Sequence, residues 1–179
     1  MRCVKSLALV ALLLGPCFQA IALPEDSSQP IRIQANTANL DDRRNIAVYT
    51  GDVIVTQGSM RLTGNEVTLT TDAEGEVRKI VSVGNPATFR QTPNPGKGPV
   101  NARGRTIEYY AAEERVVLIT NAHLDQDGNT FEGEYVTYNV AEEVVDAGRP
   151  GENAEQPGRI EMVIQPRNRT PEPEPASND

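Results

Sequence analysis

Few residues of this chain have types and spacings that could carry out chemistry. The single histidine, His123, lies close to Asp125 and Asp127, an arrangement in which a carboxylate could orient a general base. No Ser or Cys nucleophile motif accompanies it, and a lone histidine at the edge of a turn usually has a structural role. We therefore expect His123 to be structural, and a hydrolase that uses it is the weakest hypothesis.

Two further segments resemble binding loops, and both fail on spacing. Residues 125–129, Asp-Gln-Asp-Gly-Asn, look like the start of a calcium loop, but the helix–loop–helix version requires Gly at position six and Glu at position twelve, where this chain has Thr130 and Val136. A hairpin turn fits better. Gly96-Lys97-Gly98 lies between prolines and not before a helix, unlike a phosphate loop. The sequence predicts no enzyme, no cofactor and no metal site.

The first 22 residues have the pattern of an export signal. Arg2 and Lys5 provide a positive start, an apolar segment follows, and Ala20-Ile21-Ala22 supplies a small-x-small cleavage site. The apolar segment is about half the ~20 residues that a membrane span needs. We therefore expect export with cleavage after Ala22.

Both cysteines, Cys3 and Cys17, lie in this signal, so the mature chain would have no thiol, no disulfide and no cysteine-based metal site. Pro16 directly before Cys17 argues against a lipid-anchored form. The whole chain has 17 basic and 25 acidic residues and a net charge of −8; without Arg2 and Lys5 it would have 15 basic residues and a net charge of −10. An acidic protein repels nucleic acid and anionic membrane surfaces, so neither is an expected partner, but the overall charge leaves a local basic patch open.

The elements that position these residues are indicated by Tyr49–Leu69. Val53 and Val55 alternate with other side chains, and the alternation resumes after Gly58–Ser59 and after Gly64–Asn65. Alternation with a period of two, interrupted by Gly and Asn, is typical of short antiparallel strands with one buried face. The sequence therefore predicts an all-β protein.

This unit recurs in the second half of the chain. The later copy repeats the spacing of Gly58, Gly64 and Val67 at offsets of 70, 69 and 69 residues. A repeated β-unit that buries only one face indicates a stacked or rolled sheet and not a compact α/β enzyme. We expect one domain of two related halves, residues 23–165, followed by a disordered, proline-rich tail, residues 166–179.

Within the domain, alternation predicts roughly a dozen or more short strands, from Ile31–Ala35 to Arg159–Gln165. Strand breaks are expected at Gly64–Asn65 and at Gly84-Asn85-Pro86, and loops at residues 93–99 and 148–158. Residues 111–115 and 141–143 favour helix, but a single helical turn is marginal in water, so turns are expected there.

Four stretches carry a resemblance to a known family: Ile33-x-Ala35-x-x-Ala38-x-Leu40, Tyr49-x-Gly51-x-Val53-x-Val55-x-Gln57-Gly58, Met60-x-Leu62-x-Gly64-x-x-Val67 and Gly84-Asn85-Pro86-Ala87-x-Phe89. With this order and spacing, from about Ile31 to Ile164, the chain resembles the OstA-type family of lipopolysaccharide-transport proteins. The resemblance implies an open, twisted β-jelly roll whose groove shields lipid A acyl chains in the periplasm during outer-membrane assembly. Of the family's architectures, the free bridging component fits, because 179 residues cannot contain a transmembrane barrel as well.

Alternation assigns sixteen side chains to the inner face, and these are the candidate groove-lining residues. They are Ile33, Leu40, Val53, Val55, Met60, Leu62, Val67, Leu69, Phe89, Ile107, Leu118, Phe131, Val136, Tyr138, Ile160 and Met162. The residues alone leave open whether these side chains fill a core or line a groove. The chain has no Trp and only three Phe, and small β-branched side chains would leave a shallow interior. Such an interior could admit acyl chains, since each buried CH₂ contributes about 0.8 kcal/mol.

The resemblance also implies joining of jelly rolls through their edge strands. It assigns the first strand, with Ile31, Arg32 and Ile33, to an inner-membrane LptC-type partner. It assigns the last strand to an outer-membrane LptD-type partner, or to another copy in a head-to-tail homo-oligomer; the residues concerned are Arg159, Ile160, Met162 and Ile164. The alternative is a periplasmic structural or polysaccharide-binding β-protein, but the five Tyr form no regular exposed stripe for saccharides.

Overall fold

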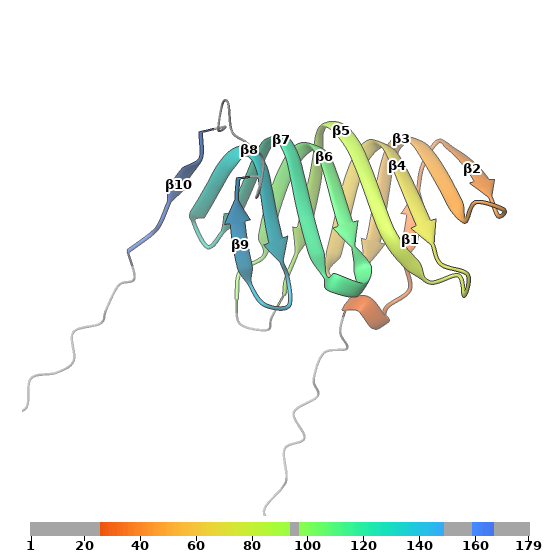
Figure 1. Ribbon diagram of the computed structural model, residues 1–179, viewed down its shortest axis with the longest axis horizontal. Coiled ribbons are helices and arrows are strands. Elements are labelled where there is room, and N and C mark those ends of the chain that lie inside the picture. Colours follow the sequence, from red (N-terminus) through yellow and green to blue (C-terminus); the bar gives the residue numbers. More distant parts are fainter. Residues whose placement is uncertain (1–25, 94–96, 149–158, 167–179) are drawn as a thin grey trace, which may run out of the picture.

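The computed structural model describes residues 26–93, 97–148 and 159–166. The predicted signal peptide, most of the loop predicted at 148–158 and all of the predicted tail except Pro166 lie outside the described residues. The described chain is almost entirely antiparallel β-structure rolled into a twisted sheet (Figure 1), which confirms the predicted fold class.

Ten strands and two short 3₁₀ turns make up the described part. The turns are η1 (Asp26–Ser28) and η2 (Ala111–Glu113). The strands are β1 (Arg32–Gln34), β2 (Thr37–Asp41), β3 (Ile46–Gln57), β4 (Met60–Thr71), β5 (Val77–Gln91), β6 (Val100–Tyr110), β7 (Arg115–Gln126), β8 (Asn129–Asn139), β9 (Val144–Ala147) and β10 (Glu161–Val163). They pair in the order β1-β3-β4-β5-β6-β7-β8-β10, with β2 beside β3 and β9 beside β8.

The central strands bend at a common level, which we call the ridge. Bulges interrupt the ladders there, for example between Thr50 and Val53 on β3 and between Val83 and Ala87 on β5. Because bulges bend a strand and increase its twist, a row of them folds the sheet into two facing walls. The front wall in Figure 1 contains residues 46–50, 66–71, 77–83, 106–110, 115–119 and 135–139. The back wall contains residues 53–57, 60–63, 87–91, 100–103, 122–126 and 129–133, and the strand ends opposite the ridge form the rim.

Glycines at the ridge allow neighbouring strands to approach closely. A Cβ on Gly64 would lie 2.8 Å from the Val83 carbonyl oxygen, and one on Gly84 would lie 2.7 Å from the Ala87 nitrogen. Gly51 has φ +88°, a left-handed conformation that glycine adopts without strain. The residues that were predicted to end strands therefore bend them instead.

This corrects the predicted number and length of the strands. Gly64–Asn65 lies inside β4, which has 12 residues, and Gly84-Asn85-Pro86 lies inside β5, which has 15 residues. The prediction was wrong here because glycine is typical both of turns and of bulges. The turns expected near 111 and 141 are present, the first as η2, whereas the short strand β9 was not predicted.

The two ends of the sheet differ from its middle, because the terminal strands are split at the ridge. On β3, the back-wall residues Ile54–Thr56 pair with β1 and the front-wall residues 46–50 pair with β2. On β8, residues 130–132 pair with β10 and residues 136–139 pair with β9. Each half of the repeat thus contributes one split strand, and the bent hairpins β3–β4 and β7–β8 occupy equivalent places.

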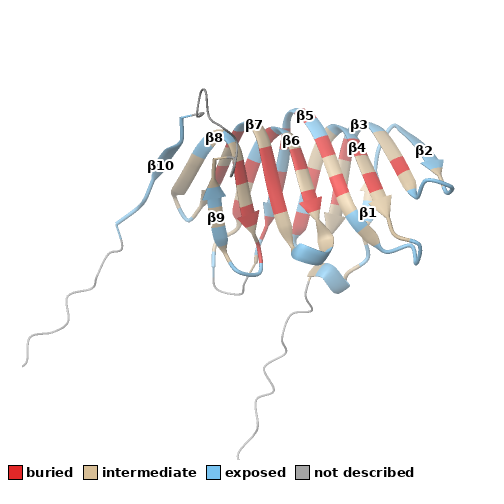
Figure 2. Ribbon diagram, in the orientation of Figure 1, coloured by how far each residue is buried: buried red, intermediate tan, exposed pale blue. Residues whose placement is uncertain are grey.

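The core lies between the two walls. Buried residues alternate along the inner faces of β3 to β8, and exposure rises toward β2 and β10 (Figure 2). The buried polar residues of the described chain are Ser82 and Gln91, and Ser82 donates its hydroxyl to the Thr63 carbonyl at 3.0 Å. The interior is therefore apolar along the length of the roll.

Candidate functional site

The structure brings most of the predicted lining residues into one cluster between the walls. Ten of the sixteen are at most 2% exposed: Val53, Val55, Met60, Leu62, Val67, Phe89, Ile107, Leu118, Val136 and Tyr138. Ile33 and Phe131 are partly buried and pack against this cluster. Leu69 is buried but lies outside the cluster.

The other three predicted lining residues lie at the ends of the sheet. Leu40, Ile160 and Met162 are 65%, 41% and 53% exposed. Leu40 is on β2 and Met162 is on β10, which each pair with a single strand. Alternation assigned these three residues to the inner face, but within the described chain no strand lies beyond β2 or β10 to cover them.

Several inner residues were missed. Ile80, Val100, Val116 and Leu124 are fully buried in the cluster, and Tyr109 is 4% exposed. Val116 lies in a run of apolar side chains, residues 116–119, whose inner and outer faces cannot be told apart by pattern alone. Ile80 is likewise followed directly by another apolar residue, Val81.

The two walls touch through aromatic side chains. The ring of Phe89, on the back wall, stacks on the ring of Tyr109, on the front wall, with centroids 6.3 Å apart and planes inclined by 29°. Burial, with a smaller effect of the Glu114 carboxylate, raises the pKa of Tyr109 to about 12. Burial and then Glu143 raise the pKa of Tyr138 to about 12. Both phenols stay neutral at physiological pH, so the interior is uncharged.

The rim is closed partly by the N-terminal segment. The Asp26 carboxylate accepts hydrogen bonds from the Ser59 amide at 2.6 Å, the Ser59 hydroxyl at 2.5 Å and the Gln91 amide at 2.9 Å. Gln57 donates to the carbonyl oxygens of Ser27 and Gln29 at 3.1 and 3.0 Å. These bonds hold η1 against the back wall. No structural role was predicted for this segment.

A cavity of about 730 Å³ opens at the rim beside η1. Ser27 and Ile31 line it from the N-terminal segment, and Val77 and Tyr109 line it from the front wall. Farther along the rim, Lys97 of the β5–β6 connection forms an ion pair with Glu143 of the β8–β9 connection. This ion pair joins the back wall to the front wall across the rim.

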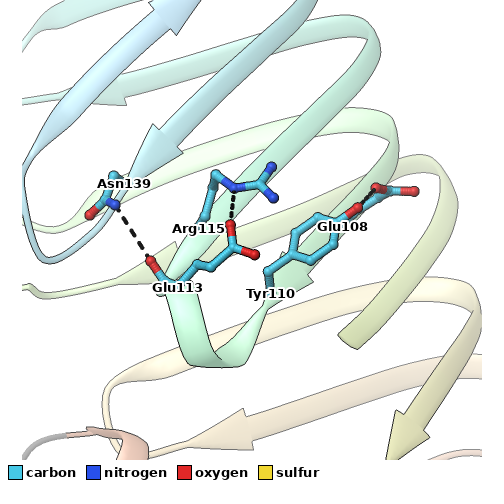
Figure 3. A network of polar contacts seen from close by, with 5 residues as sticks. All are labelled: Glu108, Tyr110, Glu113, Arg115 and Asn139. Atoms are coloured by element: carbon cyan, nitrogen blue, oxygen red, sulfur yellow. Dashed lines mark hydrogen bonds and ion pairs between the residues drawn. The ribbon is translucent and has the colours of Figure 1, made fainter. Parts of the chain in front are cut away.

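A polar network stabilises the outer face of the front wall near η2 (Figure 3). The Tyr110 hydroxyl donates to Glu108 at 2.7 Å, and the Arg115 guanidinium lies 4.2 Å from the Tyr110 ring centroid. Arg115 also pairs with Glu113 at 2.7 Å. Burial opposes ionisation of Glu108, but hydrogen bonds from Tyr110 and Lys79 outweigh it and lower the pKa of Glu108. Since these groups satisfy one another, we assign them a structural role.

The split terminal strands leave two edges at each end of the sheet. β1 and β2 pair only with β3, and β9 and β10 pair only with β8, within the part of the chain that the structure describes. The predicted edge residues lie here: Ile31 and Ile33 are half-buried, and Arg32, Arg159, Ile160, Met162 and Ile164 are exposed. The edges of β2 and β9 were not predicted as partner sites.

The single histidine contacts a carboxylate. His123 lies on the outer face of the back wall, with its Nδ1 2.7 Å from Glu132 Oε1. The described residues contain no group of three or more His, Cys, Asp or Glu placed to hold a metal ion. None of the described helices is long and apolar enough to cross a membrane.

Comparisons with known proteins agree on one family. The model of a family described as "LptA/(LptD N-terminal domain) LPS transport protein" matches residues 32–144. The lipopolysaccharide export system protein LptH of Pseudomonas aeruginosa is 51% identical over 150 residues, which cover 83% of this chain and 86% of LptH. The corresponding LptA of Escherichia coli K12 is 34% identical over 143 residues, 79% of this chain and 77% of LptA. In structure, the chain is similar to crystalline LptH, the periplasmic component of a lipopolysaccharide transport device, with a TM-score of 0.72, 49% identity and coverage of 80% of this chain and all of that one.

Proposed function

This chain belongs to the LptA/LptD N-terminal domain family of lipopolysaccharide transport proteins, and we propose that it carries lipid A acyl chains between the walls of its jelly roll in the periplasm. Like its relatives, it is a transport protein and not an enzyme. The observation that carries the proposal is the apolar layer that runs from β3 to β8 without a buried charge among the described residues.

The interior is filled in this structure, so cargo must separate the walls. Phe89 and Tyr109 meet across the interior, and ten predicted lining residues are almost inaccessible. Separation exposes apolar side chains at a cost of about 25 cal/mol per Å² of surface. An acyl chain inserted between the walls buries the same surface again, so the two states differ little in free energy. Loading and release can then both be reversible.

The geometry of the ridge supports this opening. At the ridge, bulged strands join the two walls covalently. At the rim, the described contacts between the segments that connect the strands are side-chain contacts, such as Lys97–Glu143. An exposed ion pair of this kind contributes about 0–1 kcal/mol, so it resists opening weakly. The ladders within each wall need not break when the rim opens.

We further propose that the split edges join the roll to its neighbours. An unpaired edge offers N–H and C=O groups to a strand of another protein. β1 and β2 would receive an inner-membrane LptC-type partner, and β9 and β10 an outer-membrane LptD-type partner or a second copy. The exposed apolar side chains of Met162 and Ile164, 53% and 70% accessible, support a partner at the C-terminal edge.

Site-directed photo-crosslinking in cells tests the carrier function. Val67 faces the interior and the next residue, Thr68, faces outward on the same strand, so the two positions form a matched pair. A photoreactive residue at Val67 should capture lipopolysaccharide, and one at Thr68 should not. Equal capture at both positions, or none at Val67 and Val55, would refute an interior carrier site.

A removable crosslink tests whether the rim must open. The mature chain is expected to lack cysteine, so Lys97→Cys/Glu143→Cys can be bridged by a short, cleavable bis-maleimide. The bridged protein should load no lipopolysaccharide until the bridge is cleaved. Thr68→Cys/Val81→Cys, which joins neighbouring positions within the front wall, is the control and should load normally. Normal loading by the bridged rim would show that the walls do not separate there.

A further inference from the structure

Arginine side chains gather on the outer face of the back wall. Arg61 on β4 lies directly opposite Arg90 on β5, and Arg103 on β6 lies opposite Thr88. On the other side, Arg32 of β1 lies opposite Thr56, which in turn lies opposite Arg61. All four arginines are exposed, because their sequence neighbours occupy the inner face of the same strands.

No carboxylate neutralises this cluster within the described chain. Arg90 donates to the Asn101 side-chain oxygen at 2.7 Å, which fixes its position without cancelling its charge. Among the described residues, the ion pairs of arginine and lysine lie elsewhere, as at Arg44–Asp41 and Lys79–Glu108, and at the hollow Glu132 contacts His123 and not an arginine. Like charges directly opposite each other on a sheet are destabilising. In a chain with 25 acidic and 17 basic residues, unpaired arginines on one face are not explained by folding.

The cluster surrounds a hollow and does not lie on a flat surface. A cavity of about 350 Å³ is lined by Arg61, Arg90 and Arg103 together with Thr88, Asn101 and His123. The planar guanidinium group binds phosphate and carboxylate oxygens through two parallel hydrogen bonds. The lining hydroxyl and amide groups can add neutral hydrogen bonds. Phe89 and Ala102 also line the hollow. The hollow therefore suits an anion attached to a larger group that makes both polar and apolar contacts.

The hollow lies beside the rim through which a bound lipid must emerge. Arg61 is the second residue of β4 and Arg90 is the penultimate residue of β5, so each is one residue from the rim end of its strand. One residue of strand spans about 3.3 Å. The segment η1 covers this edge, because Asp26 binds Ser59 and Gln91 there. A head group attached to acyl chains between the walls can therefore reach the outer face over this edge when η1 moves aside.

The overall charge of the chain favours a local positive site for an anionic cargo. A net charge of −8 repels a phosphorylated lipid, and this repulsion must be reversed locally where the head group lies. Acidic residues border the hollow on one side, where Glu132 contacts His123 and Asp125 lies opposite Asn101. A neighbouring hollow shares Arg103 and His123 and is lined by Glu132, Glu134 and Glu161. The arginines thus form the positive part of a face whose other end is negative.

We propose that this arginine hollow (Arg61, Arg90 and Arg103) is an anion site that holds the phosphate or carboxylate groups of the cargo's head while its acyl chains occupy the interior. The proposal rests on the proposed carrier function and deepens it, because it assigns a separate site to the polar half of the lipid. Anions of the head can come from phosphates on the acylated sugars or from acidic sugars attached to them, and both suit guanidinium groups.

The test compares two triple variants of the full mature chain. Arg61→Gln/Arg90→Gln/Arg103→Gln removes the hollow's charge, and Arg43→Gln/Arg44→Gln/Arg105→Gln makes the same change of net charge at other exposed positions. Affinity is measured at low salt for phosphorylated lipid A, for dephosphorylated lipid A and for lipopolysaccharide with acidic core sugars. The hollow variant should lose affinity about tenfold or more, or about 1.4 kcal/mol or more, for phosphorylated ligands and should bind dephosphorylated lipid normally, because only the phosphorylated ligands bond to the guanidinium groups. The control should change less than about twofold.

Each remaining outcome supports or overturns the proposal, and one of them identifies the anion that the site binds. A loss confined to the ligand with acidic sugars would support the site and identify carboxylates as its ligand. Equal affinities of the two variants for every anionic ligand would overturn it. A hollow variant that binds lipid normally but loses self-association, measured by sedimentation, would overturn it in favour of an acidic protein surface.

A soluble ligand separates this proposal from the carrier function. The deacylated, phosphorylated head group has no chain to place between the walls, so its binding is followed by NMR at the arginine Nε–Hε signals. Shifts in the wild type that disappear in the hollow variant would support the anion site even if no acylated lipid bound the interior. No shifts at these arginines at millimolar ligand would overturn it.

Discussion

Replacement of Gly84 by alanine tests the role of the ridge. A Cβ at this position would lie 2.7 Å from the Ala87 nitrogen and 2.8 Å from the Pro86 carbonyl oxygen, 0.7 and 0.6 Å short of ordinary contact at 3.4 Å. Both obstacles are backbone atoms of the bulge, so the ridge itself must shift. Overpacking of this kind costs about 1–3 kcal/mol. The smaller entropy of the unfolded alanine chain offsets about 0.4–1 kcal/mol of that cost. The expected net loss of stability is about 1–2 kcal/mol.

Gly104→Ala is the matched control at the same ridge. Its Cβ would lie 3.3 Å from the Ile119 carbonyl oxygen and 3.4 Å from that of Thr106, close to ordinary contact. Both glycines are buried and neither has a positive φ, so the unfolded-state effect is the same for both. We expect Gly104→Ala to be neutral or slightly stabilising.

Urea unfolding followed by circular dichroism measures the difference between these two variants. The free energies of unfolding should differ by about 2 kcal/mol at an unchanged m-value, which corresponds to about 4–8 °C in Tm for a domain of this size. Variants that agree within about 0.5 kcal/mol would refute the argument, because it rests on the close approach at Gly84 and nothing else distinguishes the two sites.

Three further predictions concern the rim, the interior and the edges. Asp26→Ala should cost about 1–3 kcal/mol of unfolding free energy, because it leaves the amide of the buried Gln91 without its acceptor, whereas the exposed Ser59 can turn to water; urea titration at pH 7 checks this. Tyr109 and Tyr138 keep their protons to a pKa of about 12, whereas unfolded tyrosine loses its proton near pH 10, so stability should fall between pH 10 and 12 by up to about 1.4 kcal/mol per pH unit for each tyrosine. The variant Tyr109→Phe/Tyr138→Phe should lose this part of the pH dependence, which unfolding titrations at pH 9 and 11 would detect. Met162→Lys should weaken pull-down of the C-terminal partner without changing Tm by more than about 1 °C, since Met162 is exposed. A weaker pull-down accompanied by a clear fall in Tm would contradict a surface role.

The inner faces of the strands could be predicted from the sequence because alternation is a local property. Val53, Leu62 and Leu118 are buried between the walls as the period of two requires. The same pattern could not tell that Leu40 and Met162 would be exposed. Burial at those positions depends on a neighbouring strand, which is a non-local fact.

The ridge could not be predicted because a glycine signal has two structural outcomes. At Gly64–Asn65 the chain continues in the same direction beside the same neighbour, and only the register beyond the bulge distinguishes this from a turn. The arginine hollow was not visible in the sequence because it depends on how distant strands pair. Arg61 and Arg90 are 29 positions apart, and only the β4–β5 register places them side by side. Asp26 likewise acts on Ser59 and Gln91, 33 and 65 positions away.

The split terminal strands have a mechanical consequence. If neighbours add to both edges, each joint consists of two separate short ladders, formed by strands of three and five residues at one end and three and four at the other. The two short ladders can separate one after the other, and the second ladder still holds the two proteins together when the first has separated. Such a coupling tolerates bending, rejoins quickly after a partial break, and can be dismantled without unfolding either roll. A bridge made of these units would behave as a jointed chain and not as a rigid rod.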